Sequence, residues 1–307
     1  MSRYRTVAAF LALAAIWGSA FMAINAGLAY FPPVLFAALR FDIAGLVMLA
    51  YAFYAADDPV PRGREQWTVI VVGATLIIAA YHAFLFLGES DPAVTSAIAA
   101  VIVSLSPVLT AVFARAFLPS ERLTIVGVVG LLIGLLGATV LAAPDPSNLT
   151  GGGTGAKFLV FLAAAAFALG SVLTRALDSD MEIETMEAWS MLLGAAITHL
   201  VALGLGESAA NILWTTEALL ALGYLAVVAS GIGFLIYFEL LDRLGPVEIN
   251  LVSYVAPLFA ALSGWLVLNE GITVPTVVGF VLICVGFALV KRAAIREELR
   301  RSEWLSG

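Results

Sequence analysis

Polar side chains inside long apolar stretches are the residues of this sequence that could do chemistry. Arg40 interrupts the apolar stretch 34–56, and His82 lies within the stretch 66–88. Asn250, Ser253 and Tyr254 have the i, i+3, i+4 spacing that places side chains on one face of a helix. Such groups on otherwise apolar walls bind and orient small polar solutes. We therefore expect a substrate cavity, whose remaining candidate residues are Trp17, Ser19 and Tyr81.

The composition of the chain indicates that these residues lie in a membrane. Of its 307 residues, 62% are hydrophobic and 12% are charged, and the mean hydropathy is +1.03. A soluble domain carries about 25% charged residues. The composition thus excludes a soluble enzyme, an acidic disordered chain and a nucleic-acid binder, which needs a basic face. The single cysteine, Cys284, excludes a disulfide framework and a cysteine-based zinc site.

Ten stretches are long enough to cross the bilayer as helices, because a span needs about 20 mostly apolar residues. They are continuously apolar and do not alternate, which favours helices over barrel strands. The first follows Arg3 and Arg5 as a signal peptide would, but its apolar part is too long for one, and we interpret it as a retained helix. The stretches comprise residues 6–30, 34–56, 66–88, 93–114, 123–143, 158–174, 188–206, 218–238, 249–269 and 271–290.

The basic residues predict how these helices are oriented. With the N-terminus inside the cell, the inner loops and ends carry 13 of the 15 Lys and Arg residues. The outer side carries only Lys157, and Arg40 lies within a span. Because cationic loops stay in the cytoplasm, we expect a multi-pass protein of the cell membrane with both termini cytoplasmic. The net charge of −7 arises largely from solvated acidic residues in the inner loops.

The two halves of the chain are similar in sequence. Glu121-Arg-Leu-Thr124 with Gly130 and Gly137 matches Glu270-Gly-Ile-Thr273 with Gly279 and Gly286, at an offset of 149. Pro107 and Pro257 fall inside the fourth and ninth stretches at an offset of 150, and Gly18-Ser19 aligns with Gly170-Ser171. Because each half has five helices, the second half starts on the opposite side of the membrane.

We therefore predict an all-α membrane protein of ten transmembrane helices, arranged as two inverted-topology five-helix repeats. The repeats comprise residues 1–143 and 158–293, joined by an extracellular linker 144–157 and followed by a cytoplasmic tail 294–307. Inverted repeats recur in secondary transporters, whose substrate site lies near the membrane midplane between the halves. One fold in two orientations gives two states of similar energy, which enzymes and receptors do not need.

Several motifs are shared with a known family. They are Ile16-Trp17-Gly18-Ser19-Ala20-Phe21, Ala38-Leu39-Arg40-Phe41, Pro107 with Glu121-Arg-Leu-Thr124, and Pro257 with Glu270-Gly-Ile-Thr273. Through them the chain resembles the drug/metabolite transporter superfamily, in particular the EamA-type ten-helix transporters, over nearly its full length. The resemblance implies efflux or exchange of small metabolites, often amino acids or related compounds, through a central cavity.

The individual candidates permit more than one interpretation. A charge at the centre of a span costs about 2.5–3.5 kcal/mol on insertion scales. Arg40 is therefore either a cavity cation that recognises a carboxylate or assists gating, or a structural residue that pairs with an acid or caps helix carbonyls at the outer surface. His82 is either a proton-coupling group or, like the other polar candidates, a partner in an interhelical hydrogen bond. Pro107 and Pro257 are expected to kink their helices, as hinges with freed carbonyls at the cavity or as packing kinks. The Gly130-x-x-x-Gly134 motif favours close contact with a neighbouring helix, or a homodimer seam.

A secondary transporter of small metabolites, an exporter or exchanger working by alternating access, is the function best supported by these patterns. A nucleotide-sugar or organophosphate exchanger is an alternative, although it would need several cavity cations. A membrane scaffold without transport activity is the alternative from another class. Residues 151–157 lack the Gly-Lys-Ser/Thr ending of a phosphate loop, so an ATP-driven motor is not indicated. We expect no catalytic residues, metal site or cofactor, since no acid or histidine cluster has suitable spacing.

Overall fold

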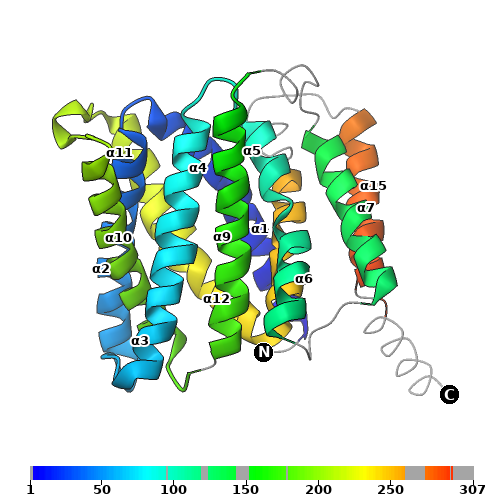
Figure 1. The fold of residues 1–307 in the computed structure, drawn as a ribbon, viewed down its shortest axis with the longest axis horizontal. Helices are drawn as coiled ribbons and strands as arrows, with labels where there is room; N and C mark the ends of the chain where they lie inside the picture. Colours follow the sequence, from blue (N-terminus) through cyan, green and yellow to red (C-terminus); the bar gives the residue numbers. More distant parts are fainter. Residues whose placement is uncertain are drawn as a thin grey trace.

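A computed structural model describes residues 3–94, 96–118, 124–142, 152–177, 179–259, 274–290 and 292. These residues form helices joined by short loops, without a strand among them (Figure 1). The sequence dictates this architecture because a bilayer offers no hydrogen-bond partners, so each apolar stretch must pair its own backbone groups in a helix.

Seven described helical stretches are long and apolar enough to cross a membrane, and shorter apolar stretches at Ile125–Val140, Pro246–Phe259 and Val277–Val290 bring the set to the predicted ten. The first five stretches are α1 (Arg3–Leu28), α2 (Pro33–Ala55), α3–η1–α4 (Gly63–Val72, Gly73–Ala80, Tyr81–Glu89), α5–α6 (Ser96–Val103, Ser106–Phe117) and α7 (Ile125–Ala142). The second five are α9 (Thr154–Leu177), α10 (Ile183–Gly204), α11–η4–α12 (Thr216–Gly223, Tyr224–Ile232, Gly233–Leu244), α13 (Pro246–Asn250) continued by the helical residues 252–259, and α15 (Val274–Val290). A short helix, η3 (Ala209–Asn211), lies between α10 and α11.

The two sets of five run in opposite directions. Figure 1 shows α1 starting at the end of the bundle marked N, whereas α9, the first helix of the second set, starts at the opposite end. The beginning of α1 and the end of α15 lie at the same end, which we call the proximal end; the other is the distal end (Figure 1). The predicted fold of two inverted five-helix repeats is confirmed.

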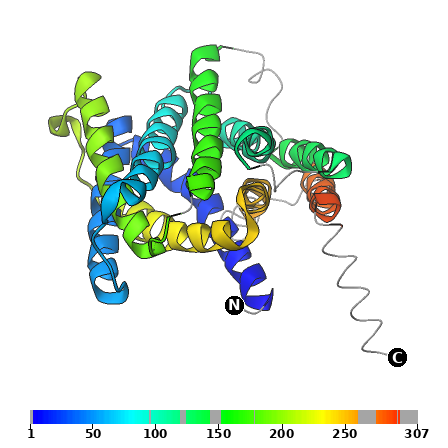
Figure 2. The same ribbon diagram turned by 60° about the horizontal axis from the view of Figure 1, so that its bottom comes forward.

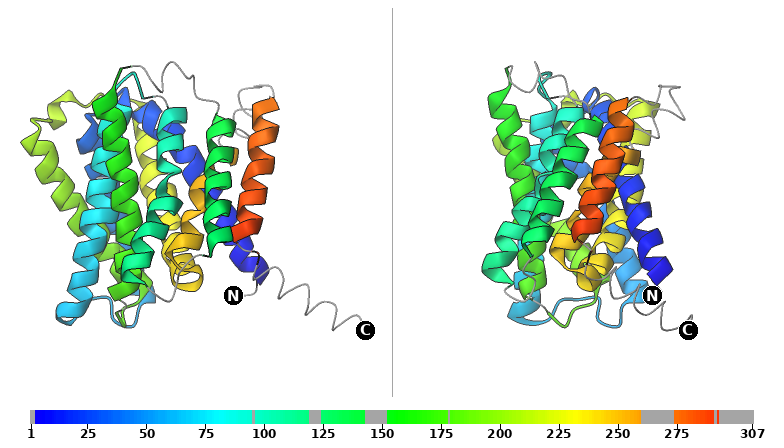
Figure 3. Two further views of the ribbon diagram at one scale, coloured as in Figure 1. Left: turned by 45° about the vertical axis from the view of Figure 1, so that its right-hand side comes forward. Right: turned by 90° about the vertical axis from the view of Figure 1, so that its right-hand side faces the viewer.

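The repeats pack on each other through equivalent helices. The second helices, α2 and α10, lie side by side, and so do the fifth helices, α7 and α15, at one edge of the bundle (Figures 2 and 3). Glycines allow the latter contact: a Cβ on Gly137 would lie 2.7 Å from the backbone nitrogen of Ile283, and one on Gly286 would lie 2.6 Å from the carbonyl oxygen of Gly130. A side chain at either position would therefore collide with the backbone of the neighbouring helix.

The third helix of each repeat crosses to the opposite repeat. Its central part is π-helical in both cases: η1 packs on α9 and α10, and η4 packs on α1 and α2. A π-helical turn has one residue more than an α-turn and is frequent at functional sites. Each repeat therefore contains one π-helical segment, and that segment packs on the other repeat.

The fourth helices of both repeats are interrupted. In the first, Ser104 and Leu105 form a turn between α5 and α6, and Pro107 lies at the start of α6. In the second, the interruption is at Leu251, directly after α13, and not at Pro257. Because proline has no backbone N–H, Pro257 leaves the carbonyl of Ser253 without its helical donor. The Ser104 hydroxyl donates to that carbonyl oxygen at 3.2 Å, so the two interrupted helices meet there.

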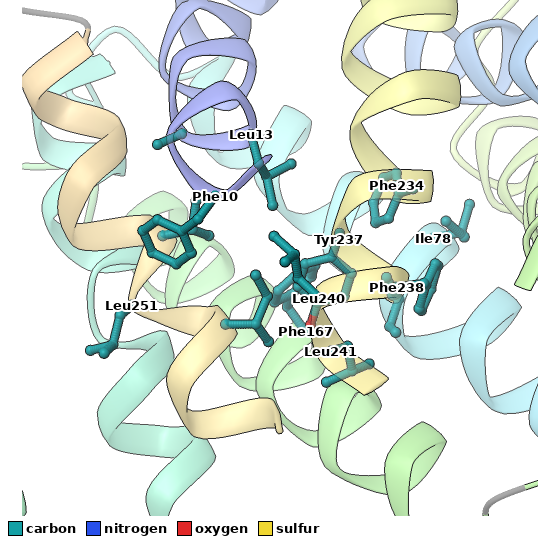
Figure 4. Packing of buried hydrophobic residues seen from close by; sticks show 14 of the residues in the cluster. Phe10, Leu13, Ile78, Phe167, Phe234, Tyr237, Phe238, Leu240, Leu241 and Leu251 are labelled. Atoms are coloured by element: carbon teal, nitrogen blue, oxygen red, sulfur yellow. The ribbon is translucent and has the colours of Figure 1, made fainter. Parts of the chain in front are cut away.

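Two hydrophobic clusters fill the bundle. The proximal cluster includes Phe10, Leu13, Phe238 and Leu241, and Figure 4 shows these side chains converging from α1 and α12. The distal cluster includes Phe31, Phe36, Phe86 and Ile212. The candidate site lies between the two.

Candidate substrate cavity

A cavity of about 60 Å³ lies between the proximal and distal clusters. Phe167 and Phe234 of the proximal cluster bound it on one side, and Ala20, Ile24 and Leu85 of the distal cluster bound it on the other. This volume admits a few water molecules. With both clusters packed, the described state leaves less space between them than a metabolite needs.

The cavity is lined by both repeats, and seven of the ten residues predicted from sequence contribute to it. These are Trp17, Arg40, Tyr81, His82, Asn250, Ser253 and Pro257. Ser19, Tyr254 and Pro107 are not among the lining residues. Ser106, next to Pro107, lines the cavity instead.

Arg40 is 3% exposed and extends from α2 towards the other repeat. Its Nε donates to the hydroxyl oxygen of Ser230, in η4, at 2.7 Å. Its Cζ lies 5.1 Å from the centre of the Phe41 ring. No described carboxylate pairs with it, which disfavours the interpretation as one half of an ion pair. Asp42, two residues further along α2, points elsewhere and is bound by His199 Nε2 at 2.7 Å.

Ring nitrogens from the cavity wall bind one carbonyl in each π-helical segment. His82 Nδ1 lies 2.9 Å from the carbonyl oxygen of Ile78, in η1. Trp17 Nε1 donates to the carbonyl oxygen of Ala229, in η4, at 3.1 Å. Ile78 and Ala229 are each the sixth residue of their segment. These contacts couple the cavity wall to the two segments that join the repeats.

A buried polar network lies on the proximal side of the cavity. Tyr237 OH and Ser171 Oγ are 2.5 Å apart, and Tyr237 OH donates to Asn250 Oδ1 at 3.1 Å. Asn250 Nδ2 donates to Thr110 Oγ1 at 2.8 Å. The network joins α9, α12 and α13 of the second repeat to α6 of the first, and its Tyr237 lies among the side chains of the proximal cluster (Figure 4).

A second serine–tyrosine pair lies on the distal side. Ser19 Oγ and Tyr224 OH are 2.5 Å apart, and Tyr224 OH donates to the carbonyl oxygen of Ile16 at 3.1 Å. Ser19 therefore lies outside the cavity wall but next to it. Ser19 and Ser171 are the aligned serines of the two Gly-Ser pairs, so the repeat places one such contact on each side of the cavity.

Tyr254 faces a different neighbour from the one its spacing predicts. The interruption at Leu251 separates it from the face of Asn250. Its hydroxyl donates to the carbonyl oxygen of Leu131, in α7, at 2.9 Å, and its ring packs where a Cβ on Gly134 would lie. The Gly130–Gly134 motif is thus buried against α15 and Tyr254 within one chain, and a homodimer would need another surface.

Several buried polar residues were not predicted. Ser106 and Ser230 lie within apolar stretches and differ in no visible way from structural serines. Glu89 and Glu187 are buried, and no described residue forms a hydrogen bond with their carboxyl oxygens. Both lie near the ends of their apolar stretches, where exposure to solvent is the usual expectation.

Some expectations fall outside the described residues. These are the motifs around Glu121 and Glu270, most of the predicted linker 144–157 and the predicted tail 294–307. Within the described part of the chain, no group of three or more His, Cys, Asp or Glu side chains is arranged to hold a metal ion.

Comparison with known proteins identifies the family. The EamA-like transporter family matches residues 5–143 and again residues 155–292. The E. coli (strain K12) inner membrane transporter YedA is 30% identical over 83% of this chain and 80% of its own length. The Bacillus subtilis (strain 168) transporter YoaV is 26% identical over 88% of this chain and 91% of its own length. A WAT1-related chloroplastic protein of Arabidopsis thaliana is 27% identical over 89% of this chain and 66% of its own length.

A solved crystal structure gives the same result for the fold. It is 25% identical, covers 97% of this chain and 100% of its own, and superposes with a TM-score of 0.79. The family consists of membrane transporters and not enzymes. With two family repeats and ten apolar helical stretches, the chain belongs to the EamA-like transporter family within the drug/metabolite transporter superfamily.

Proposed function

We propose that the protein is a secondary transporter of small metabolites, such as amino acids or related compounds, and works as an exporter or exchanger by alternating access. The observation that carries this proposal is a cavity between two inverted repeats, bounded by residues of one hydrophobic cluster on each side. Separation of the proximal cluster would open it to one side of the membrane, and separation of the distal cluster would open it to the other. The two repeats supply the similar scaffolds that such a pair of states requires.

Reconstitution tests this proposal directly. The purified full-length chain in proteoliposomes should give saturable counterflow of at least one member of a panel of amino acids, organic acids, nucleobases and vitamins. Protein-free liposomes provide the background. A Gly155→Cys variant, whose position has open space around it, should transport at the same rate and controls for handling. Absence of saturable flux for the whole panel would overturn the proposal in favour of a scaffold.

A nucleotide-sugar or organophosphate exchanger is less well supported. Such a substrate carries two or more negative charges, whereas Arg40 is the one basic residue among the described residues that line the cavity. Further cations would be needed to compensate a buried phosphate.

The proposed orientation places the proximal end, and with it both termini, in the cytoplasm. The excess of Lys and Arg in the proximal loops supports it, since cationic loops are retained inside. In a Cys284→Ser background, a membrane-impermeant maleimide applied to intact cells should label Gly155→Cys and spare Arg64→Cys. The reverse pattern would invert the assignment.

A further inference from the structure

The hydrogen-bonding groups of the cavity wall divide into those already paired and those left for a ligand. Trp17 donates to Ala229, and the Ser253 hydroxyl donates to the carbonyl oxygen of Asn250 at 2.8 Å. The Asn250 side chain is held by Tyr237 and Thr110 in the proximal network. The contacts of Trp17 and Asn250 hold different helices together, and the Ser253 hydroxyl is paired within its own helical stretch, so these three donors are already in use.

The groups left over on the wall are mostly donors. Arg40 uses its Nε on Ser230, and no described residue accepts a hydrogen bond from its two terminal nitrogens. The Ser106 hydroxyl is buried, and no described residue bonds to it. The Tyr81 hydroxyl, also on the wall, likewise has no hydrogen-bond partner among the described residues. A cation and two hydroxyls are thus free to donate to a ligand.

His82 provides a neutral acceptor beside the two hydroxyl oxygens. Because a carbonyl oxygen can only accept, the contact with Ile78 places the ring proton on Nδ1 and leaves a lone pair on Nε2. No aspartate or glutamate is among the described lining residues. A ligand ammonium would therefore find no carboxylate among the described lining residues, and only neutral acceptors, namely Nε2 of His82 and the two hydroxyl oxygens.

The remainder of the wall is apolar, and rings from Phe21, Phe167 and Phe234 lie among its aliphatic side chains. Flat rings of this kind pack against planar apolar groups, in offset or edge-to-face contacts. The guanidinium of Arg40 offers two parallel N–H groups, the geometry that a carboxylate matches with both oxygens.

Resting on the proposed function, we propose that the cavity takes an organic monocarboxylate with a planar, largely apolar body. Its carboxylate binds Arg40, with Ser106 and Tyr81 as further donors, and its body lies on the aromatic rings. A positive charge on the ligand is not recognised, so an α-amino group is tolerated but not required. This distinguishes the substrate class from amines and from phosphate esters, whose higher charge one arginine does not compensate.

A series of probes with one ring and different head groups tests this assignment on the purified full-length protein in nanodiscs. The probes are 3-phenylpropanoate, L-phenylalanine, phenethylamine and phenyl phosphate, with binding measured by calorimetry. We expect 3-phenylpropanoate to bind, L-phenylalanine to bind within about threefold of it, and phenethylamine to bind at least tenfold more weakly. Phenyl phosphate should also bind more weakly than the monocarboxylate.

Variants of the wall complete the test. Arg40→Gln should weaken 3-phenylpropanoate binding by about 10- to 100-fold, the value expected for hydrogen bonds to a charged group. Ser106→Ala should weaken it several-fold and provides a milder change if Arg40→Gln does not fold. Tyr254→Phe, a buried tyrosine outside the wall, should leave binding unchanged. Equal or tighter binding of phenethylamine, or unchanged affinity in both Arg40→Gln and Ser106→Ala, would overturn the assignment. Failure of all four probes to bind, alongside saturable transport of another solute, would overturn the substrate class and leave the proposed function standing.

Discussion

Two tyrosines of the third helical stretch of the second repeat should shift the conformational equilibrium of the protein in opposite directions. Tyr237 joins α12 to the proximal network through Ser171 and Asn250, and Tyr224 joins η4 to Ser19 and Ile16 on the distal side. Each hydroxyl makes two hydrogen bonds that hold helices together on its own side of the cavity. Removing one hydroxyl therefore weakens closure on that side alone.

The size of the effect follows from the number of hydrogen bonds that each substitution removes. Hydrogen bonds between membrane helices contribute about 0.6 kcal/mol on average and up to about 1.7 kcal/mol. Removal of two of them in Tyr237→Phe is thus expected to favour opening at the proximal end by about 1–2 kcal/mol. Since about 1.4 kcal/mol is tenfold in an equilibrium constant, the population open at that end should rise about 5- to 30-fold. Tyr224→Phe removes two hydrogen bonds of similar length, and the same arithmetic applies at the distal end.

Thiol labelling measures both populations. In a Cys284→Ser background, Leu241→Cys reports on the proximal cluster and Ile24→Cys on the distal cluster. Both side chains are only 3% exposed in the described structure, so a reagent reaches either position only when its cluster opens. Tyr237→Phe should accelerate labelling at position 241 and not at position 24, and Tyr224→Phe should do the reverse. The assignment of these hydrogen bonds to closure would be refuted if both variants accelerated labelling at the same position. It would also be refuted if neither variant changed the labelling rate at either position.

Three further predictions concern the scaffold. Trp17→Phe keeps an aromatic side chain but removes the N–H that donates to Ala229. Loss of this hydrogen bond, worth about 1 kcal/mol, should increase hydrogen exchange in η4 by about a factor of 5, as measured by mass spectrometry. The control Trp189→Phe removes an equivalent bond to the loop carbonyl of Pro59 and should leave hydrogen exchange in η4 unchanged. Gly137→Leu should lower the thermal melting temperature and the yield of folded protein, because its Cβ would lie 2.7 Å from the backbone nitrogen of Ile283. The control Gly204→Ala has open space around its Cβ and should change neither quantity. Glu187→Leu should stabilise the fold by about 1–3 kcal/mol in thermal unfolding, since no described residue bonds to its buried carboxyl; a decrease in stability would mean that the carboxyl has a partner.

The architecture was predictable from the sequence because it depends on the length of apolar stretches and on glycines and prolines in register. The direction of single side chains was less predictable. Tyr254 was assigned to the face of Asn250 on the assumption of a continuous helix, and the interruption at Leu251 turns it towards α7. Most of the predicted wall residues line the cavity, since a polar group in an apolar span needs either a partner or a cavity.

The π-helical segments and the partner of Arg40 were not predictable by the same reasoning. No residue pattern distinguished an α-turn from a π-turn here, and the contact of Trp17 with Ala229 of η4 is a tertiary one that only the fold reveals. Ser230 lies in an apolar stretch and becomes notable only once α2 packs on η4. Buried glutamates such as Glu187 were missed because the ends of apolar stretches usually face solvent.

The repeats duplicate the scaffold but not the charge. Arg40 and Ser190 lie 150 positions apart, as Pro107 and Pro257 do, and each extends from the second helix of its repeat towards the third helix of the other. Arg40 bonds to Ser230 within η4, whereas Ser190 is 3.4 Å from the carbonyl oxygen of Ile70, just before η1. Ser190 is not among the described lining residues, so Arg40 is the one arginine or lysine that the described wall presents to a ligand. In the proposed alternating-access mechanism, the duplicated serine–tyrosine pairs and π-helical segments take part in the exchange of the two states, and the single arginine selects the charge of the ligand.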